Sequence, residues 1–235
     1  MWEMRTSTDH VTEARNFMKG MPLFGDLSEP ALLALARAGK FIHIKKGQAV
    51  FYQADPSEKV YLLRTGLVSI VLESPDGREM VINEMHAGDI FGELGLLTRQ
   101  PRSTSAIARV DSEMLALPRQ AFLGTLEAEP ALARRILELT ANRLRGSSER
   151  ESALAFLDAQ ARLARLLLQL EQQAPEKGYV TISQEELAQR TGQTRQTVAK
   201  ALGRWRRAGW LITGRGHIML LKRAAFEQLE QEWRF

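Results

Sequence analysis

The sequence contains no cysteine, and this absence excludes several kinds of site at once. Without thiols the chain can form no disulfide, no thiolate zinc site and no cysteine-bound iron–sulfur cluster. Histidine is scarce as well, with four residues that form no ligand-spaced pair: His10, His43, His86 and His217. We therefore expect no metal site, and we disfavour haem as a cofactor.

Long apolar runs are also missing. No stretch is long enough to cross a bilayer, and the start of the chain, MWEMRTSTDH, lacks the apolar core of a signal peptide. We therefore expect a cytoplasmic protein with no membrane partner. Its 235 residues suit one large domain or two ordinary domains, each able to bury a core.

Acidic residues are absent from one long stretch near the C-terminus. Between Leu187 and Phe226 there are nine Arg or Lys residues and no Asp or Glu. Subtracting these nine from the total charge of +4 leaves −5 on the rest of the chain. Charge segregated in this way predicts a polyanionic partner for the C-terminal part.

Residues 91–106, FGELGLLTRQPRSTSA, have the composition of a binding site for a small anion. Gly92 lets backbone N–H groups approach a phosphate closely, and Arg102 can bind phosphate oxygens in a bidentate manner beside the hydroxyl of Ser103. A phosphate would repel Glu93, which therefore makes sense only as an acceptor for a hydroxyl of the same ligand, such as a ribose 2′-OH. Together these residues predict a nucleotide site. A glycine-rich β-turn with a solvated Arg102 is the alternative.

Short β-rich runs fill much of the first half of the chain, after a helix that Ser28 is expected to cap. The runs are separated by turn residues, and hairpin signals occur at Thr65-Gly66 and Pro75-Asp76-Gly77. Such a series predicts a small antiparallel barrel or jelly roll with room for a ligand. Strands are expected at 41–44, 49–52, 60–63, 66–72, 80–85, 103–110 and 114–117.

A long helix is predicted from Pro130 to about Leu157. Its sequence carries a coiled-coil stripe with spacings of four and three: Ala133, Leu137, Thr140, Leu144, Ser147, Glu151 and Leu154. Ser147 and Glu151 make part of this stripe polar, as expected where two such helices meet around a ligand. A frayed amphipathic helix with surface serines is the alternative.

A helix-turn-helix is predicted next. Ser183 with Glu186 forms a capping box, Thr191-Gly192-Gln193 is a tight turn, and Thr194 caps a second helix. A hairpin wing is expected over residues 209–220. A basic helix that is solvated and binds no DNA is the alternative.

The outward face of that second helix carries candidate contacts to DNA. Arg195, Gln196 and Lys200 can reach base edges, whereas Ser183 and Thr197 are candidate phosphate contacts. Val198, Ala201 and Leu202 are expected to face the core.

A nucleotide motif in a β-roll, a long helix and a winged helix-turn-helix, in that order, resemble the bacterial cyclic-AMP receptor and fumarate–nitrate regulator family. The resemblance covers about residues 21–221, and Ala155-Phe156-Leu157-Asp158 matches the hinge on the cyclic-AMP receptor side of the family. It implies an α+β chain with a cyclic-nucleotide-binding β-roll (1–130), a dimerisation helix (131–157) and a winged helix-turn-helix DNA-binding domain (158–235).

The same resemblance implies cyclic AMP as the effector. Double-stranded DNA, a second copy of the chain and RNA polymerase are the implied partners. Gly92, Glu93, Leu94, Arg102 and Ser103 would hold ribose and phosphate, while Ser147 of one subunit and Ser148 of its partner would contact adenine. Gln196 and Lys200 replace the family's Glu and Arg, which predicts a different base preference at that step.

Two other functions remain open. One is a regulator of the same fold that senses another effector or none. The other is a cyclic-nucleotide regulatory subunit of an enzyme or channel, which the basic C-terminal part and the lack of a membrane span disfavour. No catalytic constellation is visible, so we do not expect an enzyme.

Overall fold

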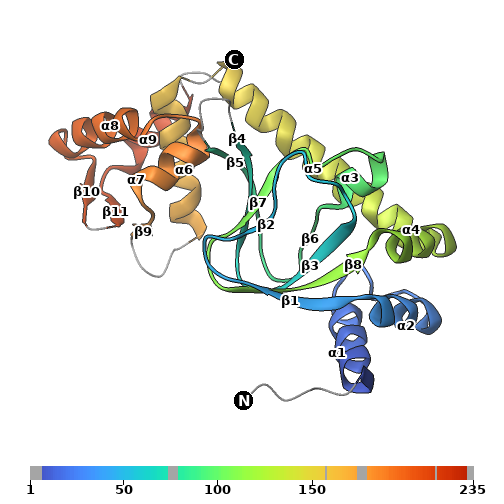
Figure 1. Ribbon diagram of the computed structural model, residues 1–235. Helices are drawn as coiled ribbons and strands as arrows, with labels where there is room; N and C mark the ends of the chain where they lie inside the picture. The colour runs from blue at the N-terminus through green and yellow to red at the C-terminus, as the bar shows by residue number, and fades with distance from the viewer. Residues whose placement is uncertain (1–6, 74–78, 157, 174–178, 215, 232–235) are drawn as a thin grey trace, which may run out of the picture. The chain divides into compact units, whose positions relative to one another are not determined.

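The computed structural model describes residues 7–73, 79–156, 158–173, 179–214 and 216–231 (Figure 1). The chain forms two compact units, Met1–Ser74 with Ile82–Arg143 and Pro75–Val81 with Leu144–Phe235. Leu157 of the expected hinge lies outside the described residues, as does the side chain of Leu154 in the expected stripe. In the part of the chain described, no helix is long and apolar enough to cross a membrane.

The first unit contains a roll of two four-stranded sheets, which confirms the expected series of short strands. One sheet has the order β1(Lys40–Ile44), β8(Ser112–Pro118), β3(Lys59–Thr65), β6(Ile90–Phe91). The other has the order β2(Ala49–Phe51), β7(Ser105–Ala108), β4(Val68–Glu73), β5(Glu79–Met85). The pairing of β4 with β5 was expected from the sequence.

Helices pack on the first of these sheets. They are α1(Ser7–Lys19), α2(Glu29–Ala38), the short α3(Glu93–Thr98), α4(Arg119–Ala128) and the beginning of α5(Pro130–Phe156). The Ser28 side chain accepts from the Ala31 N–H, so the expected N-cap of α2 is confirmed. Phe24, Leu35 and Phe122 are fully buried in the core between these helices and the sheet. A separate core inside the roll includes Phe51 and Phe91.

The hairpin expected at Thr65-Gly66 is wrong. β3 and β4 belong to different sheets, so the chain crosses from one sheet to the other at this turn. Gly66 has φ +109°, and a Cβ there would lie 2.2 Å from the Ser112 hydroxyl oxygen. The turn signal was correct, but a glycine turn does not say which strands pair. The other signal, Pro75-Asp76-Gly77, lies wholly outside the described residues.

The second unit contains the expected helix-turn-helix and wing. Its elements are α6(Ala159–Gln173), β9(Val180–Thr181), α7(Gln184–Thr191), α8(Arg195–Arg207), β10(Leu211–Thr213), β11(His217–Leu220) and α9(Arg223–Gln231). Ser183 accepts from the Glu186 N–H and Thr194 from the Thr197 N–H, each at 3.1 Å. Gly192 ends α7 with φ +65°. These observations confirm both caps and the glycine turn.

Two elements of this unit were not expected from the sequence. β9 adds a third strand to the wing, in the order β10-β11-β9, and α9 follows the wing. Phe226 of α9 is fully buried, with its ring centroid 5.1 Å from that of Trp205 and 5.9 Å from that of Trp210. The last helix therefore completes the core of the second unit.

We predict that Phe226→Ala lowers the free energy of unfolding of this unit by about 3–5 kcal/mol, because it removes a buried ring and leaves a cavity. Ile212→Ala is the matched control: Ile212 is 53% exposed, and its loss should change stability by less than about 0.5 kcal/mol. Urea unfolding followed by tryptophan fluorescence measures both. Equal stability of the two variants would contradict the role given to α9.

Candidate functional site

Arg102 lies between α3 and β7, and its side chain is buried against Gly92 before α3, with 5% of its surface exposed. Its Nη1 donates to the Gly92 carbonyl and its Nη2 to the Lys59 carbonyl, both at 2.5 Å. Its backbone pairs with the loop between β2 and β3: the Ala54 N–H donates to the Arg102 carbonyl, and the Arg102 N–H donates to the Asp55 carbonyl. Main-chain groups of two segments therefore hold the side chain, and a third segment holds the backbone of Arg102.

The guanidinium of Arg102 also lies over aromatic rings. Its Cζ is 4.1 Å from the ring centroid of Phe51 and 5.7 Å from that of Tyr61. Burial lowers the pKa of Arg102 from its ordinary value, while Tyr61, Glu93 and Asp55 oppose that shift. The group stays charged because an arginine pKa lies far above neutrality. Burial likewise raises the pKa of Tyr61. The result is a positive charge held in an aromatic environment.

Gly92 is required here for two reasons. Its φ of +79° is in the left-handed region, and a Cβ would lie 2.7 Å from Nη1 of Arg102. From the sequence, Gly92 is expected to let backbone N–H groups approach a phosphate. The structure adds that this glycine also makes room for the arginine.

Glu93 is the second buried charge, with 6% exposure. Its Oε1 accepts from Nη1 of Arg143 on α5 at 2.6 Å, and Nη2 of Arg143 donates to the Ile90 carbonyl. Within the described residues Oε2 has no hydrogen-bond partner, so it can accept from a hydroxyl. Arg143 was not predicted from the sequence. Its one signal was its position four residues before Ser147, which places both on one face of the helix.

The structure brings Gly92, Glu93 and Arg102 together. Of the other expected ligand contacts, Leu94 is 47% exposed on α3, and Ser103 is exposed directly after Arg102. Ser147 is half-buried and Ser148 exposed on α5, in the segment grouped with the second unit. The roles of these residues stay predictions.

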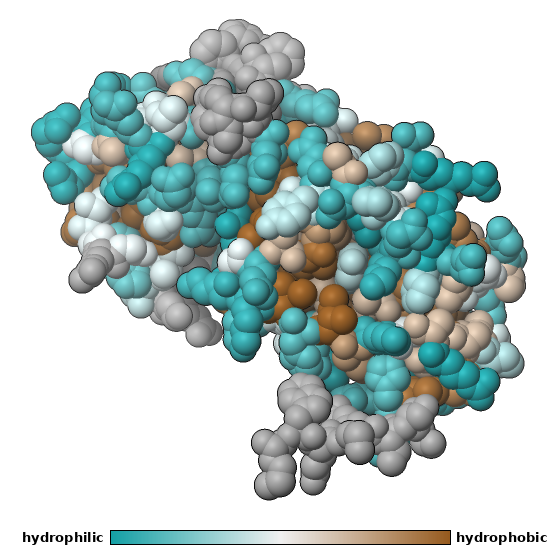
Figure 2. Space-filling view, viewed as in Figure 1, coloured by the Kyte–Doolittle hydropathy of each residue, from teal (hydrophilic) through white to brown (hydrophobic). Residues whose placement is uncertain are grey.

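The two faces of α8 agree with the prediction from the sequence. Val198, Ala201 and Leu202 are buried, whereas Arg195, Gln196, Thr197 and Lys200 are exposed. Figure 2 shows a largely hydrophilic surface over this helix. Among the described residues, the side chains of Arg195, Gln196 and Lys200 have no hydrogen-bond or ion-pair partner. Their donors are thus available to an external acceptor.

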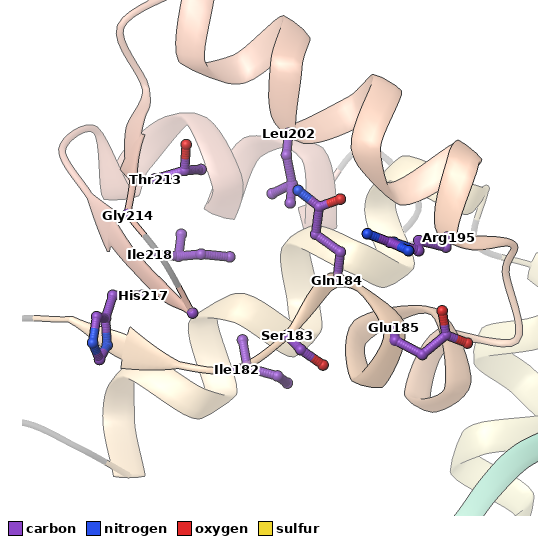
Figure 3. Close-up of a pocket in the computed structure, with 11 residues that line it drawn as sticks. Ile182, Ser183, Gln184, Glu185, Arg195, Leu202, Thr213, Gly214, His217 and Ile218 are labelled. Atoms are coloured by element: carbon purple, nitrogen blue, oxygen red, sulfur yellow. The ribbon is translucent and has the colours of Figure 1, made fainter.

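A cavity of about 290 Å³ lies between α7, α8 and the β10–β11 hairpin (Figure 3). Ser183 and Arg195, two of the candidate DNA contacts, line it together with His217 of the wing. The Ser183 oxygen accepts from a backbone N–H, so its hydroxyl hydrogen remains for a phosphate oxygen. The Thr197 hydroxyl lies 2.8 Å from that of Thr194. No group of three or more potential metal ligands gathers anywhere in the described residues.

Comparison with known proteins identifies both halves of the chain. Residues 41–129 match the cyclic nucleotide-binding domain, and residues 161–229 match the Crp-like helix-turn-helix domain. The chain is 33% identical over 213 residues to the cyclic AMP receptor protein of Thermus thermophilus, covering 90% of this chain and 98% of the relative. It is 31% identical over 195 residues to the CRP-like cAMP-activated global transcriptional regulator of Mycobacterium tuberculosis, covering 80% and 87%.

A solved structure extends the likeness of fold. The c-di-GMP responsive global regulator CLP of Xanthomonas campestris has a TM-score of 0.74 at 23% identity, covering 82% of this chain and 99% of that chain. At this identity the match concerns the fold alone. The expected α+β architecture, with a nucleotide-binding roll and a winged helix-turn-helix, is confirmed.

We predict that Arg143→Ala lowers the free energy of unfolding at neutral pH by about 1–3 kcal/mol, because the buried Glu93 loses its cation. Adding Glu93→Gln should recover part of that loss, since a neutral amide needs no counter-charge. Urea unfolding of the parent, both single variants and the double variant forms a complete cycle. Strictly additive effects of the two substitutions would show that this ion pair contributes nothing.

Proposed function

The chain belongs to the cyclic-AMP receptor and fumarate–nitrate regulator (CRP/FNR) family of DNA-binding transcription regulators, and on this premise we propose that cyclic AMP is its effector. Its relatives are transcription regulators, so it is not an enzyme. The observation that carries the proposal is a buried cation beside a buried carboxylate. Arg102 would bind the cyclic phosphate, and Glu93 would accept from the ribose hydroxyl. Two relatives named for cyclic AMP support it.

The remaining contacts of the nucleotide follow from its chemistry. The exposed Ser103 hydroxyl would add a neutral donor to the phosphate, and Gly92 and Leu94 would border the sugar. Ser147 would contact adenine from the same subunit, and Ser148 would contact it from the second copy. Hydroxyls suit adenine because they can both donate and accept.

We further propose that α5 is the dimerisation helix. Leu137 and Leu144 are each 68% exposed, and their spacing of seven places them on one stripe. A second copy of the chain would cover these leucines and remove them from water. In this division residues 1–130 form the cyclic-nucleotide-binding roll, 131–157 form the dimerisation helix, which also brings Ser147 and Ser148 to the ligand, and 158–235 form the DNA-binding domain.

The proposed switch depends on two dimer states. Cyclic AMP can favour DNA binding only if it has a higher affinity for the state in which the two α8 helices match the operator. For a two-fold dimer, that match requires half-sites centred about one helical turn apart. Arg195, Gln196 and Lys200 would read base edges, and Ser183 and Thr197 would hold phosphates. The bound dimer would then act on RNA polymerase.

A second candidate is a regulator of the same fold with a different effector. The structural likeness to a protein named as c-di-GMP responsive shows that this fold alone does not choose the ligand. One buried arginine and one buried glutamate, however, match one phosphate charge and one ribose hydroxyl better than a ligand with two phosphates. We therefore favour a cyclic mononucleotide.

We predict that the parent protein binds cyclic AMP more tightly than cyclic GMP in separate calorimetric titrations. Arg102→Leu should weaken cyclic AMP binding about ten- to a hundredfold, because it removes a charge-assisted contact to the phosphate. Arg134→Leu is the matched control, since Arg134 is 77% exposed on α5 and contacts neither Arg102 nor Glu93. Unchanged affinity of Arg102→Leu, or a preference for cyclic GMP, would refute the assignment.

Base reading by α8 gives a separate prediction. Arg195→Ala should cost about 1–3 kcal/mol on the cognate site and relax preference at one base pair per half-site, because a bidentate contact to a base is lost. Thr197→Ala should weaken binding about equally on all sequences, because phosphates carry no base identity. Both variants and the parent are compared by selection from random duplexes, with cyclic AMP and at one salt concentration. Identical base preferences for Arg195→Ala and the parent would rule out Arg195 as a reader.

A further inference from the structure

From the geometry around Arg102 we propose that Phe51 is a positioning residue for phosphate recognition. Its ring holds the guanidinium in place while two backbone carbonyls bind the Nη groups, and the Nε–H is left as the donor for an anionic oxygen of the ligand. This inference rests on the proposed function, because it concerns how the same site binds a cyclic phosphate.

The hydrogen bonds of the Arg102 side chain leave its Nε–H donor without an acceptor in the part of the chain that the structure describes. The Gly92 and Lys59 carbonyls each accept from one Nη atom. Nε is buried and has no partner among the described residues. A buried N–H without an acceptor is unfavourable, and an anionic oxygen would satisfy it. The ligand would thus complete an arrangement that the protein has already fixed on two sides.

The aromatic support comes from both sheets of the roll. Phe51 lies on β2, whereas Tyr61 and Phe91 face each other across the β3–β6 pair of the other sheet. The three ring centroids are 5.4–6.2 Å apart, and each residue is at most 8% exposed. Rings packed in this way have little freedom to move. They therefore give the guanidinium a rigid surface.

Phe51 is the main contact within this group. The Arg102 Cζ is 4.1 Å from its centroid but 5.7 Å from that of Tyr61, and the attraction of a cation to a ring face weakens with distance. A leucine at position 51 would keep the apolar burial but would remove the ring face. The guanidinium could then tilt away from the orientation that presents Nε–H, so the loss should fall on the phosphate contact.

The test is a double-mutant cycle on cyclic AMP affinity, measured by calorimetry with the full chain. Phe51→Leu in the parent should weaken binding about five- to thirtyfold. In the Arg102→Leu background the same change should weaken binding less than about twofold, because there is no guanidinium to position. Phe51→Tyr keeps the ring and should restore affinity to within about threefold of the parent.

Two results would overturn the inference. One is that Phe51→Leu has no effect on affinity in the parent. The other is the same loss of affinity in both backgrounds, which marks a purely structural role.

A spectroscopic measurement decides the case if Phe51→Leu does not fold. In the parent without added nucleotide, the Arg102 Nε–H proton, assigned by its loss in Arg102→Leu, should be shifted upfield by the ring current of Phe51. An unshifted resonance contradicts the proposal. A parent that shows this shift but binds no cyclic AMP would refute the proposed effector and leave the stacking intact.

Discussion

The buried positive charge of Arg102 sets the requirements for the surrounding roll. A guanidinium with 5% exposure is tolerated only where carbonyls accept from it and a polarisable surface covers it. Gly92 meets the first condition by adopting a positive φ and by lacking a Cβ at the point of closest approach. Phe51 meets the second condition, because its ring on β2 lies under the guanidinium. The beginning of α3, the loop before β3 and the contact between the two sheets are thus all tied to one side chain.

The polar groups of the two units are prepared for their ligands in different ways. In the roll, Glu93 and Arg102 are withdrawn from water and held by neighbours that are distant in sequence, which suits selective binding of a small molecule. On α8, the side chains of Arg195, Gln196 and Lys200 are exposed above a buried apolar face. That arrangement suits a large, hydrated polyanion, because the donors need not be desolvated before the encounter.

The sequence predicted the features that depend on neighbouring residues. Ser28, Ser183 and Thr194 cap helices, and Gly192 ends α7, because each acts through backbone atoms within a few residues. The features it did not predict depend on residues far apart. The partner of Glu93 lies fifty positions later, at Arg143, and the ring over Arg102 lies on β2. The turn at Thr65-Gly66 was located correctly, but its strands pair elsewhere, since pairing is decided by the whole sheet.

The central claim is that occupancy of the roll controls binding of DNA. The direct measurement is fluorescence anisotropy of a labelled duplex carrying the selected two-fold symmetric site, titrated with protein with and without saturating cyclic AMP at one salt concentration. We predict that cyclic AMP tightens binding to this duplex about tenfold or more, a typical allosteric coupling, and tightens binding to a scrambled duplex much less. Equal affinity for the selected duplex with and without cyclic AMP would contradict it.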